Sequence, residues 1–250
     1  MPRGFLPEAE DVAFVHGGVS GARLWRLKAS LDVFYVKIAE VEGAQALRRE
    51  IERTAWLAAN GASVPKILRT HDADNLVAFL SKAVEGKRAD EQQLPLLVLL
   101  AALGQGLANL HRLPATACPF DESVRERLAR ASRAIAEGEV DVDAFAERNR
   151  GVEPDILHAR LAAAIPREDI VVVHGNATLS NLIIADNGSL GFVDCVHSGR
   201  GDRHIDLGVV AQEIGERWGE AAIASFAASY GATHWDRRKA RYFADLYELF

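Results

Sequence analysis

A short β-hairpin pattern in the second half of the chain constrains the fold more than any other feature. Residues 182–185 and 190–194 are apolar runs of strand length, and the Asn-Gly pair at residues 187–188 is a strong hairpin-turn signal. Asn181 precedes the first run and Asp194 ends the second. Because antiparallel strands place such positions opposite each other, the hairpin is expected to bring both side chains to the same end.

The two side chains at that end are hard oxygen ligands. Amide and carboxylate oxygens suit Mg²⁺ better than a soft metal, and Mg²⁺ bound in this way usually shares its remaining positions with phosphate groups. The loop before Asn181 carries a third polar side chain, Asn176. The alternative interpretation is structural, with Asn181 capping a turn and Asp194 ending a strand. Spacing alone does not separate the two.

Strand signals dominate the first part of the chain and helix signals the rest. We expect strands over residues 24–27, 33–38 and 76–80 and a helix over residues 44–60. Apart from the hairpin and a short strand at residues 170–174, the later signals are helices, at residues 94–111, 124–136 and 155–164. The chain is therefore expected to form an α+β fold with a strand-rich N-terminal lobe, residues 1–84, and a mainly helical C-terminal lobe, residues 85–250.

The N-terminal lobe contains residues that suit a phosphate site. The glycine-rich segment 17–21 would let backbone amides approach phosphate oxygens, although an isolated segment of this kind is more often a simple hairpin. Lys37 lies in the middle of an expected strand, where an ammonium group needs a partner or must reach solvent. Glu50 on the following helix is a candidate partner. The alternative is an ordinary surface lysine.

Composition excludes several classes of protein. The 29 basic and 35 acidic residues give a formal net charge of −6, which argues against a nucleic-acid partner. Two cysteines, Cys118 and Cys195, are too few for a disulfide scaffold or a zinc site. The first residues lack an apolar signal core, and the longest apolar stretch, residues 94–103, is too short to span a membrane. We therefore expect a cytoplasmic protein with no membrane partner.

Together these pieces resemble a known family. The chain is similar along nearly its whole length to the aminoglycoside phosphotransferases, particularly the 3′-phosphotransferases of the kanamycin and neomycin type, which confer antibiotic resistance and have a protein-kinase-like fold. The resemblance is most specific in residues 172–181 (VVHGNATLSN), 191–195 (GFVDC) and 202–207 (DRHIDL). The separation of Asn181 and Asp194 also matches the spacing of that family's metal ligands.

The resemblance implies a nucleotide site for ATP or GTP with Mg²⁺. In that site Lys37 would contact the α- and β-phosphates and be held by Glu50. Asn181 and Asp194 would ligate Mg²⁺. The remaining cofactor-binding groups would be the loop around Ser20, which covers the phosphates, and the hinge backbone that holds adenine, at Ser81 and Ala83.

The chain departs from the family at Asn176, where its relatives carry the catalytic aspartate. An amide has no site that takes a proton near neutral pH, and loss of such a base typically costs ~10²–10⁴ in rate. Three interpretations stay open: a deliberate substitution in a working kinase, a nucleotide-binding pseudokinase, or a misleading register. We expect a slow or inactive form.

The resemblance also implies an acceptor site for a cationic amino-sugar. Its residues would be Glu147, Glu213, Glu248 and the C-terminal carboxylate of Phe250. Relatives carry further acidic residues near Ala144 and Ala146, so this chain offers fewer carboxylates than a polycation would favour. A different aminoglycoside, or a small metabolite such as choline or a sugar, is the alternative acceptor.

Overall fold

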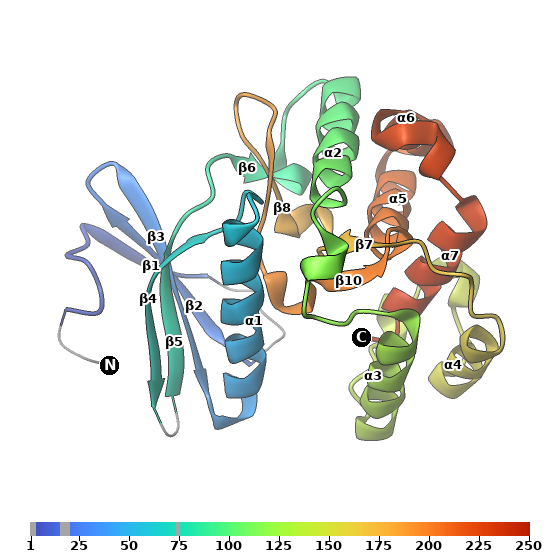
Figure 1. Cartoon of the computed structure of the whole chain (residues 1–250), viewed down its shortest axis with the longest axis horizontal. Coiled ribbons are helices and arrows are strands. Elements are labelled where there is room, and N and C mark those ends of the chain that lie inside the picture. The colour runs from blue at the N-terminus through green and yellow to red at the C-terminus, as the bar shows by residue number, and fades with distance from the viewer. Residues whose placement is uncertain (1–3, 16–20, 74–75) are drawn as a thin grey trace.

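The computed structural model describes residues 4–15, 21–73 and 76–250. Figure 1 shows a strand-rich N-terminal part beside a mainly helical C-terminal part. The N-terminal part is a five-stranded antiparallel sheet in the order β1-β2-β3-β5-β4, with helix α1 lying along it. Its elements are β1 Asp11–Val15, β2 Arg23–Ala29, β3 Asp32–Glu40, α1 Val41–Ala59, β4 Lys66–Ala73 and β5 Leu76–Lys82.

The predicted strands and helix of this part are present, and two further strands are not signalled by the sequence. β1 and β4 expose most of their residues, so neither shows the apolar alternation that predicts a strand. β3 lies between β2 and β5, with Lys37 opposite Leu24 on one side and Phe79 on the other. This register fixes Lys37 in the centre of the sheet.

The C-terminal part contains two small sheets among helices. β7 pairs antiparallel with β10, and β8 pairs with both β6 and β9. The strands are β6 Lys87–Arg88, β7 Ile170–Val173, β8 Leu182–Ile184, β9 Leu190–Phe192 and β10 Gly199–Asp202. The helices are α2 Leu96–Leu110, α3 Val124–Glu137, α4 Pro154–Ala163, α5 His204–Trp218, α6 Glu220–Gly231 and α7 Arg237–Tyr247.

One apolar core joins the hairpin to the helices around it. Leu103 and Leu107 of α2, Ile184 of β8 and Phe226 of α6 are all fully buried in this cluster. At Gly104 a β-carbon would lie 2.7 Å from the backbone nitrogen of Tyr230, so α2 and α6 approach each other more closely than any larger residue would allow. The hairpin thus stands on a closely packed pair of helices.

A buried carboxylate fixes the corner between β10 and α5. Asp202 accepts hydrogen bonds from the backbone nitrogen of Asp169 at 2.7 Å, from the backbone nitrogen and Nδ1 of His204, each at 2.8 Å, and from Lys239 Nζ at 2.7 Å. Burial alone would raise the pKa of Asp202, but these donors lower it to about 2. The corner therefore holds an ionised carboxylate.

The expected α+β, kinase-like arrangement is confirmed. The division at residues 84 and 85 stays a prediction, although β5 ends at Lys82 and the next strand begins at Lys87. Within the described ranges, no helix combines the length and the apolar character that crossing a bilayer requires. Cys118 and Cys195 are free and buried.

Candidate active site

Lys37 of β3 joins the following helix, α1, to the hairpin, which is far away in the sequence. Its Nζ lies 2.7 Å from Glu50 Oε2, which α1 presents to the sheet, and 2.9 Å from Asp194 Oδ1 at the end of the hairpin. The lysine side chain is only 11% exposed. The expected contact between Lys37 and Glu50 is therefore present, and the contact with Asp194 joins the N-terminal sheet to the predicted metal site.

The electrostatics of this cluster favour a charged lysine. Burial on its own lowers the pKa of Lys37, but attraction by Glu50 and Asp194 outweighs it and raises that pKa above its ordinary value. Burial likewise works to raise the pKa of Asp194, yet Lys37 holds it below its usual range. Burial raises the pKa of Glu50 to about 7 against the attraction of Lys37. The 2.7 Å contact between Lys37 and Glu50 indicates an ion pair.

The hairpin brings Asn181 and Asp194 to one end, as expected. Leu182 pairs with Phe192, and the backbone nitrogen of Val193 donates to the carbonyl oxygen of Asn181 at 3.0 Å. Asp194 has a positive φ of 60°, a left-handed conformation that aspartate tolerates better than most residues and that redirects the chain as the strand ends.

These two residues offer the oxygens that Mg²⁺ requires. Asn181 uses its side-chain nitrogen to donate to the carbonyl oxygen of Asn176, which leaves its Oδ1 as an acceptor. Asp194 uses Oδ1 for Lys37. Neither Asn181 Oδ1 nor Asp194 Oδ2 has a hydrogen-bond donor among the residues that the structure describes. The donor set therefore fits a hard divalent cation, completed by phosphate oxygens and water.

The loop that carries Asn176 is fixed through its backbone. Asp206 on α5 accepts from the backbone nitrogens of His174 and Gly175 at 2.7 and 2.8 Å. Gly175 has a φ of 83°, and a β-carbon there would lie 2.0 Å from the carbonyl oxygen of His197, so only glycine fits. Asp206 therefore supports the backbone of this loop from α5.

Asn176 itself contacts a residue close to the end of the chain. Its Oδ1 accepts from the hydroxyl of Tyr247 at 2.8 Å. Burial raises the pKa of Tyr247 to about 12, so the phenol is neutral and donates its proton in this contact. For a ligand, Asn176 keeps its NH₂ donor and the second lone pair of Oδ1.

The predicted adenine hinge lies at the end of β5. Ser81 is buried between β3 and β4, opposite Tyr35 and Ile67. The backbone nitrogen of Ala83 already donates to the carbonyl oxygen of Val33 at 2.9 Å, so adenine would have to displace that bond to use it. Ser20 lies outside the described residues.

The four predicted acceptor residues occupy different surroundings. Glu147 is 81% exposed and pairs with Arg150. Glu213 accepts from the backbone nitrogen of Leu179 at 3.2 Å, and burial raises its pKa. The ring of Phe250 lies over the guanidinium groups of Arg127 and Arg130, at 4.9 and 5.4 Å from its centroid.

Glu248, the fourth of these residues, is largely neutralised by Arg148. Arg148 donates to Glu248 at 2.9 Å and to Asp245 at 2.5 Å, and its Nη2 also bonds Gln212 at 2.7 Å. The side-chain nitrogen of Asn149 adds a second donor to Glu248 at 2.9 Å. The sequence analysis missed Arg148, because nothing in the sequence pattern separates it from the other charged residues of its loop.

A second cluster missed by the sequence analysis lies under Phe250. Glu122, whose side chain is 1% exposed, contacts Arg53 at 2.6 Å, Arg127 at 3.3 Å and Arg130 at 2.5 Å. Three guanidinium groups thus surround one carboxylate. Burial lowers the pKa of Arg127 to about 10, which shows how little water reaches the cluster.

Helices α5, α6 and α7 line an open pocket of about 640 Å³. Its lining combines alanines with charged residues and includes Arg148 and Gln212, the same pair that contacts the Glu248 cluster. Lys37, Asn181 and Asp194 do not line it. Its volume is in the range of small-molecule sites.

Comparisons with known proteins agree with this geometry. Residues 11–243 match the model of a phosphotransferase enzyme family. An aminoglycoside 3′-phosphotransferase from Streptomyces fradiae is 31% identical, over 94% of this chain and 94% of its own length.

Two solved structures share the fold. The crystal structure of an aminoglycoside 3′-phosphotransferase of type VIII superposes with a TM-score of 0.88 at 31% identity, covering 99% of this chain and 96% of that one. An aminoglycoside phosphotransferase from Streptomyces rimosus, in complex with ADP and streptomycin, gives a TM-score of 0.79 at 28% identity, covering 93% and 94%. The chain therefore belongs to the phosphotransferase enzyme family, and within it to the aminoglycoside phosphotransferases.

Proposed function

We propose that this protein is a phosphotransferase that moves the γ-phosphate of ATP or GTP to a hydroxyl of an aminoglycoside or related amino-sugar. The observation that carries the proposal is the double contact of Lys37 with Glu50 and Asp194. This contact brings the ammonium group that would bind the phosphates next to the carboxylate that would bind the metal. Solved relatives bind ADP and streptomycin, which supports both halves of the site.

In this proposal each residue acts by position and charge. Lys37 contacts the α- and β-phosphates, and Glu50 keeps its ammonium group directed at them. Asn181 Oδ1 and Asp194 hold Mg²⁺, which when bound neutralises charge on the phosphates. Phosphoryl transfer requires little covalent chemistry from the protein, so catalysis depends mainly on this neutralisation and on orientation of the acceptor hydroxyl.

Asn176 limits the reaction. A carboxylate at this position would orient the acceptor hydroxyl and take its proton, whereas the amide only forms hydrogen bonds. Its Oδ1 already accepts from Tyr247 and its NH₂ group only donates, so the side chain has no basic site for the proton of the acceptor hydroxyl. The same observation favours a second function, a nucleotide-binding pseudokinase without turnover.

The test restores the carboxylate. We expect Asn176→Asp to raise phosphotransfer from ATP to kanamycin or streptomycin at least about a hundredfold over the unchanged protein. The matched control is Asn187→Asp, the same change on the exposed hairpin turn, where Asn187 accepts only from the backbone of Ser189. That variant should leave the rate unchanged.

The outcomes separate the candidate functions. Nucleotide binding without turnover in either variant would support the pseudokinase and contradict the enzyme. Turnover of choline or a simple sugar, with none of the aminoglycosides, would assign a small-metabolite kinase. Absence of any binding of Mg-ATP would refute both nucleotide-dependent functions.

A further inference from the structure

A buried chain of hydrogen bonds leads from the catalytic loop into the helical part. It begins at Asp206, which is fully buried and binds the backbone nitrogens of His174 and Gly175. Asp206 Oδ2 also lies 3.0 Å from Nε2 of His111, the residue that ends α2. Asn176 directly follows Gly175, so these hydrogen bonds support the backbone of the loop that carries Asn176.

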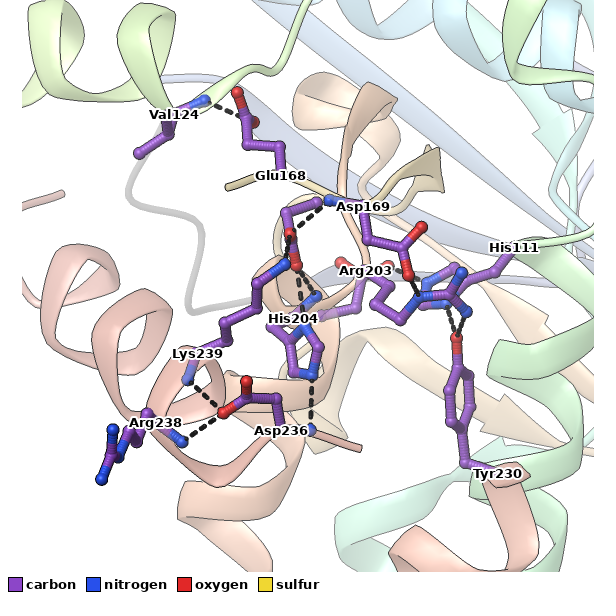
Figure 2. Close-up of polar contacts among 12 residues, drawn as sticks. His111, Val124, Glu168, Asp169, Arg203, His204, Tyr230, Asp236, Arg238 and Lys239 are labelled. Atoms are coloured by element: carbon purple, nitrogen blue, oxygen red, sulfur yellow. Dashed lines mark hydrogen bonds and ion pairs between the residues drawn. The ribbon is translucent and has the colours of Figure 1, made fainter. Parts of the chain in front are cut away.

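The chain of contacts continues beyond His111 to α6. His111 Nδ1 lies 2.8 Å from the hydroxyl of Tyr230, and Arg203 Nη1 donates to the same hydroxyl at 2.6 Å. Arg203 in turn donates from Nε to Asp169 at 2.7 Å. Figure 2 shows His111, Tyr230 and Arg203 converging on the hydroxyl, with Asp169 on the far side of the guanidinium group.

The close packing of α2 on α6 holds this geometry. Gly104 of α2 lies directly against the backbone of Tyr230, where a β-carbon would be 2.7 Å from its nitrogen. His111 and Tyr230 are 7% and 6% exposed. Water therefore does not compete for the contact between them.

The direction of each hydrogen bond follows from the donors available. A guanidinium group only donates, so the Tyr230 oxygen accepts from Arg203 and directs its own proton at His111 Nδ1. Nδ1 is then unprotonated, and a neutral imidazole carries its proton on Nε2, where Asp206 accepts it. A doubly protonated His111 would leave the Tyr230 proton without an acceptor among the described residues.

We propose that Tyr230 is a positioning residue: oriented by Arg203, its hydroxyl donates to His111 Nδ1 and holds the ring so that Nε2–H donates to Asp206, which supports the catalytic loop. The inference rests on the proposed function only through the role of residue 176. Its structural part can be tested with Asn176 left in place, whether or not the protein catalyses phosphotransfer.

The first test reads the proton on His111. In ¹⁵N-histidine NMR spectra of the full chain, His111 should show a single Nε2-protonated form. Tyr230→Phe keeps the ring and removes the hydroxyl, and Arg203→Gln frees the hydroxyl to rotate. Both should loosen the imidazole ring, so that its Nε2 proton exchanges with solvent faster than in the unchanged protein. The matched control is Tyr242→Phe, which removes a hydroxyl from a residue 9% exposed that bonds Leu161 instead.

The second test measures how firmly the loop around Gly175 is held. We expect amide hydrogen exchange at Gly175 to become about fivefold faster in Tyr230→Phe, the effect of losing roughly one hydrogen bond, and to stay unchanged in Tyr242→Phe. In the Asn176→Asp background, Tyr230→Phe should lower kcat and leave the KM for nucleotide unchanged. Failure of phosphotransfer alone would count against the proposed function and not against this positioning role.

One result overturns the inference. If the Nε2 proton of His111 exchanges equally slowly in both Tyr230→Phe and Arg203→Gln, the hydroxyl does not hold the ring. Unchanged exchange at Gly175 in Tyr230→Phe would likewise show that the loop does not depend on Tyr230. Because the two variants alter different elements, a folding defect in one leaves the other to decide.

Discussion

Replacing Glu122 by glutamine should destabilise the protein severely. The carboxylate is 1% exposed and contacts three arginines at 2.6, 3.3 and 2.5 Å. Glutamine would offer the three guanidinium groups one neutral oxygen in place of two charged ones, and its NH₂ group would face buried donors such as Arg127, whose side chain is 4% exposed. Removing one partner of a buried ion pair typically costs about 3–5 kcal/mol, because the remaining charges stay buried and unpaired.

The magnitude can be measured by unfolding. At about 2–4 °C per kcal/mol for a chain of this size, the loss corresponds to a fall of roughly 6–20 °C in Tm. Urea unfolding followed by circular dichroism should show a lower midpoint with an unchanged slope, since the native fold buries the same surface.

Glu126→Gln is the matched control. Glu126 lies four residues further along, its side chain is 48% exposed, and its distance from Arg133 is 3.7 Å. Exposed pairs of this kind contribute little, so the control should change stability by less than about 0.5 kcal/mol. A loss below about 1 kcal/mol in Glu122→Gln would refute the reasoning, because it would show that the three arginines remain solvated.

Three further variants test the rest of the site. Lys37→Met should weaken Mg-ATP binding about tenfold or more by isothermal calorimetry, through loss of charge-assisted contacts to phosphate; unchanged affinity would remove Lys37 from the nucleotide site. Arg148→Gln releases Glu248 and Asp245. It should raise the affinity for a tricationic aminoglycoside several-fold at low salt, and weaker binding would contradict this. Asp202, with its pKa lowered from 3.8 to about 2, supplies about 2 kcal/mol of stability that is complete above pH ~5 and lost as pH falls towards 2. Asp202→Asn should therefore lower the free energy of unfolding at neutral pH and reduce its dependence on pH in acid. An unchanged dependence on pH would contradict an ionised carboxylate at Asp202.

Local patterns predicted the elements that build the site. The hairpin carries two apolar runs around an Asn-Gly turn, and the strand with Lys37 and the helix with Glu50 carry strand and helix patterns. The contact of Lys37 with Glu50 follows from the adjacency of that strand and helix. β1 and β4 escaped prediction because exposed edge strands carry little apolar alternation.

The clusters that support the site depend on contacts distant in sequence. Arg53 and Glu122 are 69 positions apart, and His111 and Tyr230 are 119 apart. No periodicity marks such pairs, because each arises only when separate helices pack. The neutralisation of Glu248 by Arg148 escaped prediction for the same reason, since the sequence shows the charges but not their partners.

The way the loop around Asn176 is held has an evolutionary consequence. Asp206 and Asn181 form hydrogen bonds with backbone atoms of residues 174–176. None of these bonds depends on the side chain at position 176. Aspartate and asparagine have the same shape and their codons differ by a single nucleotide. A lineage with this scaffold could therefore silence its chemistry and later recover it by one mutation, without ever passing through an unfolded intermediate.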